Sequence, residues 1–225
     1  MRFIHTSDWH IGKNLEGHSR LEEQEKFCND FIKIVETNNI DMVIIAGDVY
    51  DTSNPPAGAE TLFYKTICKL ADNGNRCVLV IAGNHDNPER LSAITPLAKE
   101  QGIIILGYPL SSTTKLKYNG YEIVEAKEGY MKLDIKGEKV CVITLPYPSE
   151  KRLNDAIRGV ESEEEFQTLL GLYNQCPLTE LIIHPRVLKD FYKYNVRMNA
   201  FKEGFEKSRH SVCYNGDIFR RKDYD

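Results

Sequence analysis

Apolar residues follow two kinds of pattern along the first half of the chain. Three short runs are wholly apolar, which is typical of strands buried on both faces of a sheet, and a shorter apolar-rich run stands at the start. Between these runs apolar residues recur every three or four positions, which predicts helices. The predicted strands are residues 2–6, 42–46, 77–82 and 103–106, and the predicted helices are residues 20–38, 59–72 and 89–101, the last broken near Pro96. Because strands that alternate with helices tend to pair in parallel, this half predicts a parallel sheet covered on a face by helices.

The second half has a different pattern. Residues 121–126, 130–135 and 139–145 are strand-like, and Gly129 and Gly137 mark turns between them, so we expect an antiparallel meander in a second sheet. A helix is predicted over residues 150–174, and one more apolar strand over residues 181–184. The two halves together predict the α/β fold class.

Composition and charge narrow the class of protein without identifying a ligand. The chain has 225 residues, 41% hydrophobic and 28% charged, with a net charge of −4, which excludes an intrinsically disordered chain. Its apolar runs are far shorter than the ~20 residues of a membrane span, and its start lacks a signal-peptide core, so a cytoplasmic protein is expected. Six scattered cysteines without a Cys-x-x-Cys pair predict free thiols. Residues 186–225 hold ten basic and six acidic side chains, which suits nucleic acid or simply a solvated surface.

Polar residues cluster where three of the predicted strands end. The first strand is followed by Ser-Asp-Trp-His, the second by Gly-Asp and the third by Gly-Asn-His-Asp. The carboxyl ends of parallel strands meet at the same edge of a sheet, so these side chains are expected to converge there. The candidate residues are Asp8, His10, Asp48, Asn84, His85 and Asp86.

This set of donors points to metal chemistry on phosphate esters. Carboxylate, imidazole and amide donors together suit Mn²⁺, iron or Zn²⁺. An aspartate can bridge two ions with its two oxygens, and ions about 3.5–4 Å apart generate a hydroxide at neutral pH and clamp phosphoryl oxygens. A histidine that is not a ligand can then protonate the leaving oxygen.

The order of these motifs resembles that of the calcineurin-like metallophosphoesterases. Four longer strings are similar to the SbcD family, the nuclease component of the bacterial SbcCD complex: TSDWHIGK at 6–13, GDVYDTSNPP at 47–56, GNHDNPERLS at 83–92 and LPYPSEKRL at 145–153. The resemblance covers residues 1–180 and implies a four-layer α/β/β/α sandwich, incomplete at its C-terminal side. It also implies two divalent metal ions, with manganese as the expected metal.

The resemblance assigns metal-binding roles to five residues. Asp8 and His10 would bind the first manganese ion, Asp48 would bridge the two ions, and Asn84 would bind the second. His184, at the end of the strand over residues 181–184, fits the next family ligand, although Pro185 departs from the family there and an ordinary surface histidine is the alternative.

Two further residues receive catalytic roles from the resemblance. His85 would donate a proton to the leaving oxygen or stabilise the transition state. Asp86 would orient His85, or else is a hydrogen-bonded turn residue, and the sequence leaves both interpretations open.

The resemblance also implies a substrate and a partner. Members of the family act on DNA in recombination, replication and repair, as 3′–5′ double-strand exonucleases that open hairpins and cut single strands. They pair with SbcC, an SMC-like ATPase. No membrane association is implied.

The sequence departs from the family toward its end. The family's Gly-His-x-His motif, whose histidines complete both metal shells, is missing, and residues 185–211 show no resemblance. We therefore expect a nuclease domain over residues 1–184 and a divergent, truncated end over 185–225, from an altered reading frame or from divergence, without capping and partner-binding regions. Three hypotheses stand: an SbcD-type nuclease, another metallophosphoesterase acting on phosphoproteins or small phosphoesters, and an inactive remnant.

Overall fold

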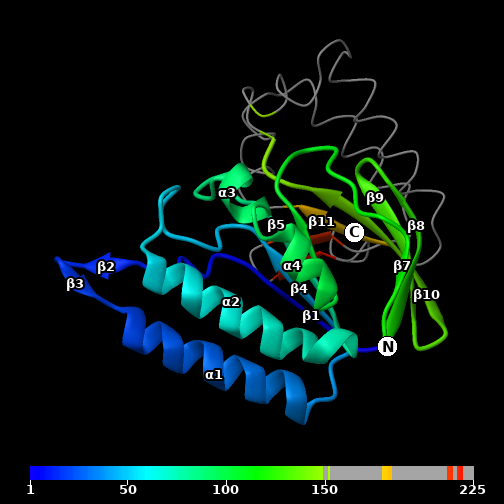
Figure 1. Ribbon diagram of the computed structural model, residues 1–225, viewed down its shortest axis with the longest axis horizontal. Helices are drawn as coiled ribbons and strands as arrows, with labels where there is room; N and C mark the ends of the chain where they lie inside the picture. The colour runs from blue at the N-terminus through cyan, green and yellow to red at the C-terminus, as the bar shows by residue number, and fades with distance from the viewer. Residues whose placement is uncertain (149–151, 153–178, 184–211, 215–216, 220–225) are drawn as a thin grey trace.

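The computed structural model of the chain describes residues 1–148, 152, 179–183, 212–214 and 217–219. Within them, helices cover one face of a four-stranded sheet, and a larger sheet packs against the other face (Figure 1). The predicted α/β class is confirmed. Apart from residue 152, the helix predicted over residues 150–174 lies outside the described residues.

The first sheet is wholly parallel, as its apolar runs predicted. Its strand order is β1-β4-β5-β6, and each neighbouring pair runs in parallel. The strands are β1 (Phe3–Thr6), β4 (Met42–Ala46), β5 (Cys77–Ile81) and β6 (Ile103–Leu106). Each lies within one residue of its predicted bounds.

Two long helices lie side by side across one face of this sheet (Figure 1). The helices are α1 (Leu21–Thr37), α2 (Ala57–Ala71), α3 (Pro88–Ser92) and α4 (Thr95–Glu100), with a 3₁₀ turn over Asp72–Gly74. The helix predicted over residues 89–101 is broken as expected, but the break precedes Pro96. The proline occupies the first turn of α4, where its missing N–H removes no hydrogen bond.

Both faces of the first sheet are buried, which explains its uninterrupted apolar strands. Along β4, Val43 and Ile45 belong to the core beneath the helices, whereas Ile44 and Ala46 belong to the core between the two sheets. Side chains of a strand point alternately to its two faces, so a strand with two apolar neighbours needs an apolar residue at every position.

The second sheet has the order β13-β12-β11-β10-β9-β8-β7. The predicted meander is confirmed, because β7 to β10 pair antiparallel, whereas β11 runs parallel to β10 and β12 parallel to β11. The strands are β7 (Leu116–Lys117), β8 (Tyr121–Lys127), β9 (Tyr130–Ile135), β10 (Glu138–Leu145), β11 (Thr179–Ile183), β12 (Val212–Tyr214) and β13 (Asp217–Phe219).

A small hairpin before α1 was not predicted from the sequence. Strands β2 (Asn14–Leu15) and β3 (His18–Ser19) pair antiparallel, and Glu16 and Gly17 between them both have positive φ. Two positive φ angles are the signature of a tight hairpin turn, for which Glu-Gly is a weak sequence signal. None of the described helices is long and apolar enough to cross a bilayer.

Candidate metal centre

The predicted site residues follow the carboxyl ends of three adjacent strands. Strand β1 ends at Thr6, β4 at Ala46 and β5 at Ile81, and these strands are neighbours in the first sheet. The three loops that follow them therefore leave the same edge of the sheet, where α/β proteins commonly bind ligands.

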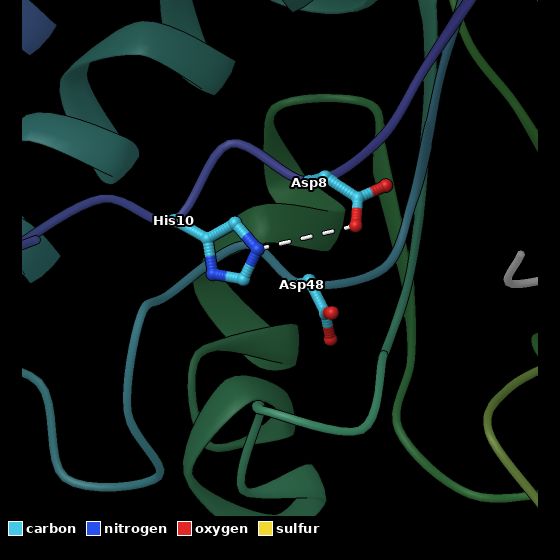
Figure 2. A group of neighbouring side chains, drawn as sticks. All are labelled: Asp8, His10 and Asp48. Atoms are coloured by element: carbon cyan, nitrogen blue, oxygen red, sulfur yellow. Dashed lines mark ion pairs between the residues drawn. The ribbon is translucent and has the colours of Figure 1, made fainter. Parts of the chain in front are cut away.

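Three of the predicted ligands come together at this edge. Asp8, His10 and Asp48 each offer one ligand atom, and these atoms all lie within 4.8 Å of one another (Figure 2). Nε2 of His10 is 3.9 Å from Oδ1 of Asp8. Asp8 is exposed, His10 is half-buried, and Asp48 is only 3% exposed, so the group opens to solvent on one side. Two carboxylates and an imidazole are donors that Mn²⁺, iron and Zn²⁺ share, and the group fits such an ion.

All three residues have left-handed backbone conformations. Their φ angles are +59° at Asp8, +46° at His10 and +49° at Asp48. Such conformations are sparsely populated by residues other than glycine and persist only where the surroundings enforce them.

Hydrogen bonds between two loops enforce these conformations. The amide of Asp8 donates to the carbonyl of Gly47 at 3.0 Å, and the amide of His10 donates to the carbonyl of Asp48 at 3.0 Å. The amide of Ile11 continues the series to Val49 at 2.9 Å. The two loops are thus joined along their backbones, and the three ligand side chains are set by main-chain geometry.

The side chain of Gln24 in α1 secures the first loop from its other side. Its Nε2 donates to the carbonyl of His10 at 2.8 Å, and its Oε1 accepts from the amide of Gly12 at 2.9 Å. Sequence reasoning missed this residue, which carries no motif of its own. Its only signal is a polar side chain on the first turns of the helix that follows the loop.

The turn after β5 packs directly against Asp48. The amide of His85 donates to Oδ1 of Asp48 at 2.9 Å. A Cβ atom on Gly83 would lie 2.1 Å from the same oxygen, so only glycine fits. Asn84 lies between these two residues and is half-buried. The turn thereby brings Asn84 and His85 to the edge that carries the other ligands.

The ring of His85 is held by the main chain of Asp51. Nδ1 of His85 lies 2.8 Å from the carbonyl oxygen of Asp51. A carbonyl can only accept, so Nδ1 carries the hydrogen and Nε2 is the acceptor nitrogen of the neutral ring.

Asp51 also approaches the other site histidine. Its Oδ1 lies 3.4 Å from Nδ1 of His10 and 3.8 Å from Nζ of Lys13. A carboxylate on Nδ1 orients a ligating imidazole and leaves Nε2 for the metal. Asp51 was not singled out from the sequence; the signal for it was a second acidic residue on the loop that carries Asp48.

Asp86 contacts the backbone rather than the ring of His85. Its buried carboxylate, 1% exposed, accepts from the amides of Gly83 at 2.8 Å, Tyr50 at 3.0 Å and Val49 at 3.2 Å. Burial raises the pKa of this carboxyl, while the three N–H groups oppose that rise. The geometry favours the turn-residue alternative, in which Asp86 joins the loops after β4 and β5.

The remaining predicted ligand, His184, lies outside the described residues. Strand β11 ends at Ile183, and its partner in register there is Leu145 at the end of β10.

Comparison with known proteins gives a family match over most of the chain. The family model described as calcineurin-like phosphoesterase matches residues 1–174. The SbcD component of the nuclease SbcCD from Bacillus subtilis (strain 168) is 45% identical over 164 residues, which are 73% of this chain and 38% of the relative. Proteins of the same name from Escherichia coli (strain K12) and Rhodobacter capsulatus are 41% identical over 92 residues and 38% identical over 108 residues, respectively. These two matches cover 41% and 48% of this chain, but 23% and 27% of the relatives, so the chain spans well under half of each relative's length.

Proposed function

The chain belongs to the calcineurin-like phosphoesterase family, and from this premise we propose that it is a metal-dependent nuclease subunit of the SbcD type that hydrolyses DNA phosphodiesters. The observation that carries the proposal is the group formed by Asp8, His10 and Asp48, whose ligand atoms lie within 4.8 Å of one another beside the ring of His85. The name shared by the relatives supports DNA as the substrate.

The donor side chains of the site suggest how two divalent ions, expected to be Mn²⁺, would be bound. Asp8 and His10 would bind one ion, Asn84 the other, and Asp48 would bridge them, with His184 as a further ligand. Two such ions supply a nucleophile at neutral pH and positive charge for the phosphoryl oxygens.

The protein's own contribution to the reaction centres on His85. Its Nδ1 hydrogen is bound by the carbonyl of Asp51, so its Nε2, when protonated, would donate to the leaving oxygen of the cleaved phosphodiester. Asp86 would act indirectly, by holding the turn that carries His85 against the loop after β4.

Cleavage assays with the purified 225-residue chain test the proposal. We expect Mn²⁺-dependent cutting of single-stranded and hairpin DNA that disappears with a chelator and in the Asp48→Asn variant. Hydrolysis of a small chromogenic phosphodiester without cleavage of DNA would favour another metallophosphoesterase. No hydrolysis of either substrate by a folded preparation would favour the inactive remnant, for which the missing Gly-His-x-His motif argues.

The finer activities are proposed on the same basis. From the resemblance to the SbcD family we infer 3′–5′ exonuclease action on duplex ends in recombination, replication and repair, together with an SbcC-type ATPase; the name of the relatives supports the nuclease and the SbcCD complex. Co-purification of the chain with such an ATPase, compared with the ATPase alone, tests the partnership. Failure of the two to associate would refute it for these 225 residues.

A further inference from the structure

A single side chain from the segment after β10 bonds the turn that carries two of the candidate site residues. Arg152 lies past the end of β10, and its guanidinium reaches the turn after β5. Nη1 donates to the carbonyl of Gly83 at 2.8 Å, and Nη2 donates to the carbonyl of Asp86. The two carbonyls are those of the first and last residues of the turn, so the guanidinium bridges both of its ends.

The two hydrogen bonds to the turn depend on the planar, forked shape of the arginine guanidinium. The guanidinium is a planar fork with separate N–H groups on two nitrogens, and it can therefore bond two carbonyls at once in fixed directions. A lysine ammonium, a point charge on a flexible stem, can satisfy only part of this geometry. Both carbonyls are main-chain atoms of the turn, so these two hydrogen bonds act on the site through the position of the turn.

The surroundings of Arg152 hold its fork in place. The guanidinium carbon lies 5.4 Å from the centroid of the Tyr147 ring, and Nη1 also approaches the carbonyl of Tyr147 at 3.5 Å. The amide of Tyr147 in turn donates to the carbonyl of Ala82 at 2.9 Å, one residue before the turn. Arg152 is half-buried, and its hydrogen bonds, the Tyr147 ring and the carboxylates of Asp86 and Asp48 stabilise this partly desolvated cation.

Within the described part of the chain, the other hydrogen bonds of the turn use its N–H groups. The amides of Gly83 and His85 bond Asp86 and Asp48, respectively. After the turn, the side chain of Asn87 caps α3, accepting from the amides at the helix start. The amide of His85 thus ties the turn to the loop after β4, and the carbonyls of Gly83 and Asp86 tie it to Arg152 in the segment after β10.

We propose that Arg152 is a positioning residue of the metal centre, which fixes the Gly83–Asp86 turn so that Asn84 and His85 face the group formed by Asp8, His10 and Asp48. The proposal deepens the proposed nuclease function and rests on it for the chemical role of His85. In this proposal Arg152 acts through the turn and is neither a metal ligand nor a catalytic residue.

Arg76 provides a matched control at the opposite end of the same strand. It is also half-buried and also donates to two main-chain carbonyls, those of Ile40 at 2.7 Å and of Leu70. It precedes β5, whereas the metal centre follows that strand. Loss of either arginine should lower stability, but only loss of Arg152 should alter the site.

The first experiment compares Arg152→Gln, Arg152→Lys and Arg76→Gln with the unmodified chain in Mn²⁺-dependent phosphodiester hydrolysis. We expect Arg152→Gln to lower kcat by roughly tenfold or more with KM within about twofold, since a small misplacement of catalytic groups can lower rates by ~10². Arg152→Lys should recover part of kcat, and Arg76→Gln should keep kcat per folded molecule. Equal kcat for the two glutamine variants would overturn the proposal.

A second readout does not depend on activity. Histidine ring resonances of the metal-free chain, observed by NMR, should shift for His85 in Arg152→Gln but not in Arg76→Gln, while those of His18 in the hairpin stay in place in both. An unmoved His85 signal would refute the positioning role. If the unmodified chain hydrolyses nothing, the nuclease proposal fails, and the NMR comparison still decides whether Arg152 positions the turn.

Discussion

The imidazole rings of His10 and His85 lie edge to face, with their centroids 4.8 Å apart. Both rings turn Nδ1 toward the same residue, because the carboxylate of Asp51 approaches His10 and the carbonyl of Asp51 bonds His85. One residue thus directs two rings, and the Nε2 atoms of both are left for the chemistry of the site. This division suits one histidine that binds metal and one that transfers a proton.

Replacing His85 should separate catalysis from metal binding. We expect His85→Gln to lower the rate of Mn²⁺-dependent DNA cleavage by about 10²–10⁴-fold, which is the usual contribution of a positioned proton donor. The affinity for Mn²⁺, measured by calorimetry, should change little. His18→Gln in the exposed hairpin is the control and should cleave normally. Normal cleavage by His85→Gln would remove this residue from the mechanism.

Asp51 should tune the affinity for the metal. In Asp51→Asn the charged contact with Nδ1 of His10 is weakened, and we expect Mn²⁺ to bind about 10–100-fold more weakly, as is typical for loss of such a supporting carboxylate. Calorimetric titration measures this change. Asp30→Asn on the exposed side of α1 should bind Mn²⁺ like the unmodified chain, and equal affinities for both variants would contradict the role of Asp51.

Gly83 and Gly137 should respond differently to alanine. A Cβ on Gly83 would collide with Asp48, so we expect Gly83→Ala to displace that carboxylate and abolish cleavage. Gly137 has open space around its Cβ position but a φ of +87°, so Gly137→Ala should only lower the free energy of unfolding, by about 1–2 kcal/mol. Thermal melts and cleavage assays on both variants check this, and an active Gly83→Ala would argue against the close packing at the site.

The ion pair between Asp41 and Lys136 should make stability depend on pH. The hydrogen bond from Lys136 holds the pKa of Asp41 below its ordinary value of 3.8. A lowered folded-state pKa stabilises the fold above the unfolded pKa, and this contribution is lost as the pH falls through the folded value. The free energy of unfolding of Asp41→Asn, from denaturant titrations, should therefore be lower than that of the unmodified chain at neutral pH, by less than ~1 kcal/mol.

The same difference should vanish in strongly acidic solution. At a pH below the folded-state pKa of Asp41, the protonated aspartate is uncharged, as is the asparagine that replaces it in the variant. The unmodified chain and Asp41→Asn should then have the same free energy of unfolding. A gap that persists unchanged into acid would mean that Asp41 acts through its hydrogen bond to the amide of Arg2 and not through its charge.

The first sheet could be predicted from the sequence because burial of a strand on both faces requires an uninterrupted run of apolar residues. Strands β4, β5 and β6 are apolar at every position. Glycine and polar residues follow β4 directly and follow β5 after Ala82. The hairpin of β2 and β3 was missed because strands of two residues have no periodicity. Predictions for residues 150–174 and for His184 remain predictions.

The convergence of Asp8, His10 and Asp48 was predictable from the sequence, but the residues that support them were not. Asp8, His10 and Asp48 stand at strand ends, a position that topology brings to one edge. Gln24, Asp51 and Arg152 act through contacts with the main chain or with a neighbouring ring. Such contacts depend on how loops approach in space, and residue type at a given spacing does not encode them.

The left-handed backbone conformations of Asp8, His10 and Asp48 place metal binding in conflict with the stability of the fold. Glycine would adopt these torsions freely at each position, whereas the side chains needed for metal binding carry an energetic penalty there, about 1–3 kcal/mol apiece for strained backbones of this kind. A lineage released from selection for catalysis could therefore lose the metal centre and gain stability in the same substitution. This chain has all three side chains and therefore still carries the backbone strain that such substitutions would remove.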